Sequence, residues 1–183
     1  MKPLFTVHGG EYLVGSEIER RFRRARIWIP ARDTGIDLLV TDSKNRRAVS
    51  LQAKFSRDFL VTHMGAEFHK QLRACGWWTI NRDKLRKSPA DFWVFVLYGF
   101  AGRTVDFVVV PPKELWRRLR AIHGSQKIIQ TYIWVTELGR CWETRGLTHE
   151  DQLRIADGSY ANGPRDFTRY LKNNWAPVAK LNR

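Results

Sequence analysis

Three short apolar runs lie close together between residues 26 and 55, and they constrain the fold more than any other feature of the chain. RIWIP (26–30), IDLLVT (36–41) and AVSLQAKF (48–55) each have the length and composition of a strand, and the polar segment DSKNRR joins the last two. Connections this short join antiparallel neighbours, because a parallel crossover needs a dozen or more residues. The sequence therefore predicts an antiparallel meander of three strands.

The rest of the chain predicts an α+β fold in one domain of 183 residues. Apolar runs predict further strands over residues 91–100, 101–110 and 127–137, and a turn around Gly102 should join the first two as a hairpin. NRDKLRKSP (81–89) is expected to be a basic loop. Helical spacing of apolar residues predicts helices over residues 11–26, 64–75, 113–124, 146–156 and 164–175.

Basic residues far outnumber acidic ones, with 32 Lys and Arg against 18 Asp and Glu, a net charge of +14. Such an excess favours a polyanionic partner, most often nucleic acid, because each neutralised phosphate releases condensed counterions. A solvated basic surface is the simpler alternative. The chain shows no long apolar segment, secretory leader or lipidation motif, so we expect a cytoplasmic protein without membrane attachment.

Polar residues interrupt two of the predicted strands at Asp37, Gln52 and Lys54. Gln52 and Lys54 are two residues apart, so their side chains should share one face of a strand. A hairpin through DSKNRRA would bring Asp37 beside them. The opposite face should point into the core through Val49, Leu51, Ala53 and Phe55.

The first predicted helix carries two acids with different expected roles. Glu11 falls in the middle of the apolar stripe of this helix and should face the sheet, where a carboxylate needs a divalent cation or Lys54 as its partner. Glu17 lies toward the edge of the stripe, and we expect it to pair on the surface with Arg20 or Arg21. Glu17 remains the second choice for a ligand on this helix.

Glu11, Asp37, Gln52 and the backbone carbonyl of Ala53 form an all-oxygen ligand set. Oxygen ligands suit Mg²⁺ or Mn²⁺ rather than zinc, and such an ion can polarise a phosphoryl oxygen. Lys54 could orient the nucleophile and stabilise the charge that builds on phosphorus oxygens. The candidate catalytic residues are therefore Glu11, Asp37, Gln52 and Lys54, and the expected chemistry is metal-assisted phosphodiester hydrolysis.

This order of motifs resembles the PD-(D/E)XK nuclease superfamily, which includes restriction endonucleases and archaeal Holliday-junction resolvases. The resemblance rests on a helix with Glu11, then GID, then QAK at the end of a hairpin, and it covers roughly residues 10–100. It implies an αβββαβ core with a mixed sheet flanked by helices, residues 104–176 as an elaboration, and a Mg²⁺-dependent endodeoxyribonuclease. Asp37 then corresponds to the motif acid, Lys54 to the motif lysine and Glu11 to the helix glutamate.

Gln52 departs from this pattern, because it stands where the family usually has a second acid. Its neutral amide should weaken metal binding and leaves the number of metal ions open, one or two. An active DNA endonuclease is the first hypothesis, and a catalytically inactive nucleic-acid-binding or structural protein with the same fold is the second. RNA is a third choice of substrate, and cutting both strands of a duplex would call for a homodimer.

Two basic segments are candidate phosphate contacts. RRFRRAR (20–26) has five arginines in seven residues, and a solvated helix face is its alternative reading. The second segment precedes Ser88. The candidate nucleic-acid-binding residues are Arg20, Arg21, Arg23, Arg24, Arg26, Lys84, Arg86 and Lys87.

Other reactive or aromatic side chains have structural interpretations. Trp77 and Trp78 are expected mainly in the core, with base stacking as the alternative. Cys75 and Cys141 lack the spacing of a zinc site and are expected to be buried small hydrophobes. Three further residues could suggest a metal site, but their spacing does not favour one: His63, Glu67 and His69.

Overall fold

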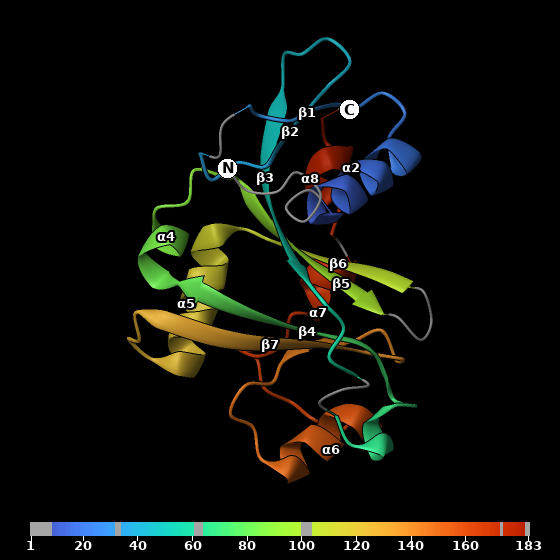
Figure 1. Ribbon diagram of the computed structural model, residues 1–183, viewed down its shortest axis with the longest axis vertical. Coiled ribbons are helices and arrows are strands. Elements are labelled where there is room, and N and C mark those ends of the chain that lie inside the picture. The colour runs from blue at the N-terminus through green and yellow to red at the C-terminus, as the bar shows by residue number, and fades with distance from the viewer. Residues whose placement is uncertain (1–8, 32–33, 61–63, 100–103, 173, 182–183) are drawn as a thin grey trace.

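The larger of two β-sheets, sheet A, contains the predicted meander. The computed structural model describes residues 9–31, 34–60, 64–99, 104–172 and 174–181 (Figure 1). Sheet A has the order β1-β2-β3-β5-β6, with antiparallel pairs except for β3 and β5, which are parallel. The predicted meander and the antiparallel pairing of the predicted hairpin are therefore confirmed, whereas the expected turn around Gly102 lies outside the described residues. Its strands are β1 (Arg26–Trp28), β2 (Leu38–Thr41), β3 (Ala48–Ser56), β5 (Phe92–Gly99) and β6 (Thr104–Val110).

Sheet B is smaller and fully antiparallel, in the order β4-β7-β8. Its strands are β4 (Leu72–Asn81), β7 (Ile128–Thr136) and β8 (Cys141–Glu143), and the sequence predicted only β7. The helix expected over residues 64–75 is wrong, because this segment forms the short 3-10 helix η1 (Ala66–Phe68) and the start of β4. Pairing of β4 with β7 along its whole length supplies backbone hydrogen bonds that override the local helical pattern.

Helix boundaries follow recognisable end signals. The helices are α2 (Gly9–Arg21), α4 (Arg82–Arg86), α5 (Pro112–His123), α6 (His149–Asp157), α7 (Thr168–Lys172) and α8 (Ala176–Ala179). Thr148 caps α6 by accepting a hydrogen bond from the backbone of Asp151, and Gly124 ends α5 with a positive φ of 68°. None of the helices in the described part of the chain is long and apolar enough to cross a membrane.

Two helix expectations require correction. The expected basic loop over 81–89 contains α4, because the Asn81 side chain accepts hydrogen bonds from the backbone of Asp83 and Lys84 and caps a helix. The helix expected over 164–175 is reduced to α7, preceded by a turn in which Asp166 forms a bridge with Trp142 of β8.

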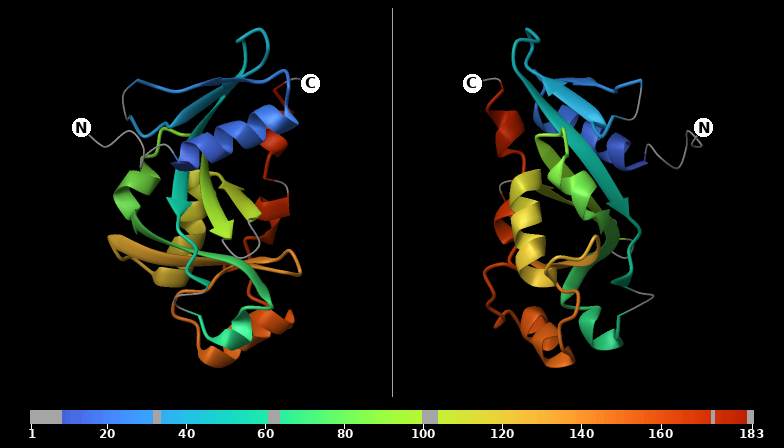
Figure 2. Two further views of the ribbon diagram at one scale, coloured as in Figure 1. Left: turned by 45° about the vertical axis from the view of Figure 1, so that its right-hand side comes forward. Right: turned by 90° about the vertical axis from the view of Figure 1, so that its left-hand side faces the viewer.

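The elements stack in layers around the two sheets (Figures 1 and 2). Helices α2 and α8 cover one face of sheet A, where Ile18 packs in one apolar cluster with Val94. The other face of sheet A packs on sheet B and α5 through Phe95, Trp78 and Leu119. Helix η1 and α6 cover part of the outer face of sheet B. Strand β3 therefore has α2 on one side and sheet B on the other.

Candidate functional site

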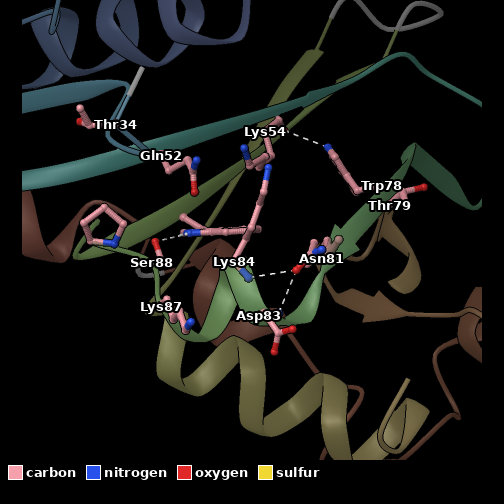
Figure 3. A pocket seen from close by; sticks show the side chains of 14 residues that line it. Thr34, Gln52, Lys54, Trp78, Thr79, Asn81, Asp83, Lys84, Lys87 and Ser88 are labelled. Carbon is pink, nitrogen blue, oxygen red and sulfur yellow. Dashed lines mark hydrogen bonds between the residues drawn. The ribbon is translucent and has the colours of Figure 1, made fainter. Parts of the chain in front are cut away.

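A pocket of about 880 Å³ opens where β3, β4 and α4 meet (Figure 3). Gln52 and Lys54 line it from β3, as the alternation of that strand predicts. Lys84 and Lys87 line it from the α4 side. Gly35, which has a φ of +86°, brings the chain past the pocket before β2 begins. The predicted pair of β3 side chains therefore faces a concave site.

The hairpin brings Asp37 to the edge of this site. The Asp37 backbone N–H donates to the Leu51 carbonyl at 2.9 Å, so β2–β3 pairing extends one residue beyond β2. The Asp37 Oδ2 accepts a hydrogen bond from the Ala53 N–H at 2.8 Å. Because the N–H and C=O of a strand residue point to the same side, the Ala53 carbonyl points to the side on which Asp37 lies. Asp37 is thus fixed beside the segment that carries Gln52 and Lys54.

Two tryptophans hold Lys54 in place. Its ammonium lies 5.2 Å from the ring centroid of Trp93, within the range of a cation–π contact. The Trp78 Nε1–H donates to the Lys54 carbonyl at 3.1 Å. Both the backbone and the charged end of Lys54 are therefore positioned by aromatic side chains of the pocket.

The pocket carries a positive charge that suits an anion. Figure 3 shows Lys84 extending from α4 toward Lys54 across the pocket. The backbone N–H of Lys84 donates to the Asn81 side chain at 3.0 Å, which anchors the first turn of α4. Among the described residues that line the pocket, three are lysines and one, Asp83, is acidic. A phosphate group would meet two ammonium groups from opposite walls.

Neither Glu11 nor Asp37 is among the described residues that line the pocket. Glu11 is only 9% exposed and faces sheet A, as predicted, but α2 covers the face of β3 opposite to Gln52 and Lys54. The helix approaches β3 closely, since a Cβ on Gly10 would lie 2.8 Å from the Cβ of Phe55. Phe55 was expected in the core and is 44% exposed, because it lies near the end of β3.

The donors beside Asp37 fit a hard divalent cation in their chemistry. The Asp37 carboxylate lies next to the Ala53 backbone, and the Gln52 amide belongs to the same strand segment. Across the described ranges, no group of three or more His, Cys, Asp and Glu side chains could hold a metal ion. A cation here would therefore rely on one carboxylate and neutral oxygens. Glu67 and His69 are exposed, and His63 lies outside the described residues.

The two basic segments lie at different places relative to the pocket. Arg20 and Arg21 both pair with Glu17, with Arg20 Nε at 3.0 Å from Glu17 Oε2, which confirms the surface role expected for Glu17. Lys84 and Lys87 line the pocket, and Arg86 is exposed on the same helix. The other arginines of the RRFRRAR segment are exposed on the turn and at the start of β1: Arg23, Arg24 and Arg26.

Both cysteines are buried, as predicted. Burial raises the pKa of the Cys75 thiol to about 12 and that of Cys141 well above its usual value. A thiol with so high a pKa stays protonated near neutral pH, so neither cysteine is suited to act as a nucleophile.

Sequence reasoning missed several residues of the pocket wall, among them Trp93, Asn81 and Ser88. Trp93 is the cross-strand partner of Gln52 in the parallel β3–β5 pair, and its Nε1–H donates to Ser88 Oγ at 2.9 Å. The only local signal was Asn81, because an Asn followed two residues later by an acid is typical of a helix start.

Comparison of the chain with protein-family models, with curated protein sequences and with solved structures finds no match. What the pocket does must therefore be derived from its own residues. Its charged and amide lining residues are three lysines, Asp83, Gln52 and Asn81, and the Asp37 carboxylate lies beside the same strand segment.

Proposed function

We propose that the protein is a metal-dependent endonuclease that hydrolyses DNA phosphodiester bonds. The observation that carries the proposal is the hydrogen bond that holds the Asp37 carboxylate on the Ala53 backbone, beside two β3 side chains that face a lysine-lined pocket. An acid, an amide oxygen and an ammonium on two neighbouring strand segments could hold a metal ion and stabilise the charge that develops in phosphodiester hydrolysis. The net charge of +14 favours nucleic acid as the substrate.

Lys54 is the central group of the proposed site. Its ammonium, held over Trp93, would stabilise the charge that develops on the phosphoryl oxygens in the transition state. Lys84 would bind the same phosphate from the α4 wall, and Lys87 would contact the backbone of the bound strand. The pocket would therefore position the scissile phosphate before any chemistry occurs.

Asp37, Gln52 and the Ala53 carbonyl would hold Mg²⁺ or Mn²⁺. When bound, this cation would supply additional positive charge to the phosphoryl oxygens. The hydrogen bond from Ala53 orients the Asp37 carboxylate in the plane of the sheet, and this fixed orientation favours binding of an ion at the strand edge. Glu11 is not needed in this arrangement.

The topology supports the resemblance to PD-(D/E)XK nucleases in part. Helix α2, the meander β1–β3 and the parallel partner β5 follow the order of the αβββαβ core expected from that family. The connection between β3 and β5 differs, because the long strand β4 of sheet B precedes the five-residue helix α4 there. A nuclease built on this chain would thus use sheet B as one wall of its pocket.

The second candidate function is binding of nucleic acid without cleavage. Two observations favour it: Gln52 is neutral, and the described residues contain no cluster of three ionisable metal ligands. The basic pocket would serve a binding protein equally well.

Cleavage assays with purified protein separate the two functions. The protein is incubated with Mg²⁺ or Mn²⁺ on linear, supercoiled, single-stranded and branched DNA. We expect Lys54→Ala to reduce the cleavage rate at least about 100-fold, because a group that stabilises transition-state charge is lost. Asp37→Asn keeps an acceptor for the Ala53 N–H but removes the charge, and it should cause a loss of similar size.

Lys44→Ala is the matched control. Lys44 is an exposed lysine in the turn of the same hairpin and is not among the residues that line the pocket. Its variant should cleave like the wild type. Cleavage that survives both Lys54→Ala and Asp37→Asn would refute the proposed site, and tight DNA binding without any cleavage would establish the second function.

A further inference from the structure

The outer face of sheet B is covered over only part of its area. Near one end, η1 and α6 bury Cys75 of β4 and Trp134 of β7 in an apolar cluster. Toward the other end, the same face carries Trp77 and Thr79 of β4, and both are exposed. Trp77 is 36% exposed, whereas its neighbour Trp78 on the inner face is 7% exposed. A large aromatic ring thus remains at the surface of a sheet whose other face is core.

Trp77 belongs to a row of contacting side chains that runs across the strands, in which Trp77 and Arg145 are exposed and Phe59 and Tyr132 are half-buried. The Trp77 and Tyr132 rings are cross-strand partners, with centroids 6.0 Å apart and an interplanar angle of 36°. Phe59 contacts Trp77 edge-on at 6.1 Å, and the Arg145 guanidinium lies 5.8 Å from the Tyr132 ring centroid. We call Phe59, Trp77, Tyr132 and Arg145 the aromatic row.

The aromatic row has the chemistry of a base-stacking surface. Exposed aromatic rings and an arginine on a sheet face stack on unpaired bases, and every base offers a π-face to them. Bases inside a duplex are already stacked and paired, so this surface selects single strands. The one charged group of the row is the cation of Arg145, and the chain carries a net charge of +14, which complements a phosphate backbone.

The aromatic row is directly connected to the pocket. The Trp77 backbone N–H donates to Ser56 Oγ at 3.0 Å, and Ser56 follows Lys54 by two residues, about 7 Å along β3. Thr79 lines the pocket and lies on the same face of β4 as Trp77. A strand bound in the pocket would therefore reach Trp77 within a few nucleotides.

We propose that the aromatic row binds unpaired bases of single-stranded DNA, next to the pocket that holds the phosphate. The choice of DNA rests on the proposed function, whereas the stacking itself rests on the geometry of Trp77, Tyr132 and Arg145. The protein should thus prefer DNA with a single-stranded segment, such as a tail, flap or branch, over a blunt duplex.

Fluorescence anisotropy with the full chain tests this preference. Labelled oligo(dT) and a blunt duplex of the same length are titrated in EDTA, so that no cleavage can occur. Trp77→Thr and Tyr132→Thr should each weaken binding of oligo(dT) about tenfold, because a stacked base loses its partner. Both variants should bind the duplex within about twofold of wild type. Trp77→Phe keeps an aromatic ring and should retain most of the affinity for oligo(dT).

Trp28→Thr is the matched control, since Trp28 is a 50% exposed tryptophan on a strand of sheet A. It should leave binding of oligo(dT) unchanged. The inference is overturned if Trp77→Thr binds oligo(dT) like the wild type, or if it loses oligo(dT) and duplex equally. Tighter Trp77-dependent binding of oligo(U) than of oligo(dT) would overturn the assignment to DNA.

The experiments can refute either of the two proposals without refuting the other. If no DNA is cleaved but Trp77-dependent binding of oligo(dT) persists, the aromatic row stands and the endonuclease proposal fails. If Lys54-dependent cleavage occurs but Trp77→Thr binds oligo(dT) normally, the endonuclease proposal stands and the aromatic row has only a structural role.

Discussion

Each of the two sheets holds a cluster of charged and polar groups, but the clusters differ in what satisfies them. In sheet B, Glu143 is 0% exposed. Its carboxylate binds Arg165 Nη1 at 2.6 Å and His123 Nε2 at 3.0 Å, and it accepts a hydrogen bond from Thr131 Oγ1 at 3.2 Å. The chain itself therefore surrounds this acid with donors.

In sheet A, the polar side chains Gln52 and Lys54 of β3 lie at a pocket, and Lys54 also contacts the buried Trp93 ring. Gln52 and Lys54 line about 880 Å³ of accessible space together with Lys84. A buried acid surrounded by donors links parts of the fold, because its removal leaves cations without a partner. Polar groups that face a pocket can bind a ligand. For this reason we propose the β3 cluster, and not the more extensive Glu143 network, as the functional site.

The largest expected effect comes from removing Glu143, the buried acid of the sheet B network. Glu143→Ala leaves Arg165 and His123 next to an uncharged cavity and should lower the free energy of unfolding by about 3–5 kcal/mol. Urea denaturation at neutral pH measures this change in the free energy of unfolding. Glu137→Ala, at an exposed site near the end of β7, should cost less than about 0.5 kcal/mol. A cost below about 1 kcal/mol for Glu143→Ala would show that the network does not hold the fold together.

A second, partly exposed network on α5 should give a smaller, pH-dependent effect. Hydrogen bonds from Arg117, then from Tyr170 and Arg118, lower the pKa of Glu114 from its usual 4.5 to about 2. Its contribution to stability is therefore complete above pH 4.5 and is lost as the pH falls toward 2.

Because solvent screens this partly exposed group, we expect a contribution of about 1–2 kcal/mol. Glu114→Gln should remove that amount above pH 4.5 and flatten the stability profile between pH 4.5 and 2, as measured by urea denaturation across this range. Parallel profiles of the two proteins would contradict the assigned pKa.

The smallest effect concerns Gln52, one of the β3 side chains that line the pocket. Gln52→Glu adds a carboxylate beside Asp37 and should lower the Mg²⁺ concentration for half-maximal cleavage about fivefold, equivalent to roughly 1 kcal/mol. A Mg²⁺ titration of the cleavage rate measures it. Gln71→Glu, at an exposed position before β4, is the control and should not change the Mg²⁺ dependence. An unchanged dependence in Gln52→Glu would exclude position 52 from the cation site.

Elements with local partners were predictable from the sequence. The meander β1–β3 and the hairpin β5–β6 depend on connections that are short and polar or contain glycine, and on alternation within each strand. The β2–β3 hairpin of this meander fixes Asp37 beside Ala53, so this part of the candidate site followed from the sequence as well.

The segment 64–75 shows where such reasoning stops. Met64, Phe68, Leu72 and Cys75 have helical spacing, and all four pack in the same apolar cluster. The burial of Cys75 was predicted correctly, but the conformation of the segment was not, because pairing with β7 decides it and β7 begins more than fifty residues after Cys75. The far wall of the pocket was unpredictable for the same reason: Trp93 meets Gln52 only through the parallel pairing of β3 with β5.

The hydrogen bonds from Trp78 to Lys54 and from Trp77 to Ser56 join the two sheets beside the pocket. The residues of the candidate site therefore come from separate elements, and this has an evolutionary consequence. Under the proposed function, substitutions on β4 and α4 would change which nucleic acid is held while Asp37 and Lys54 on sheet A stay as they are. Ligand preference and chemistry would then diversify independently in this fold.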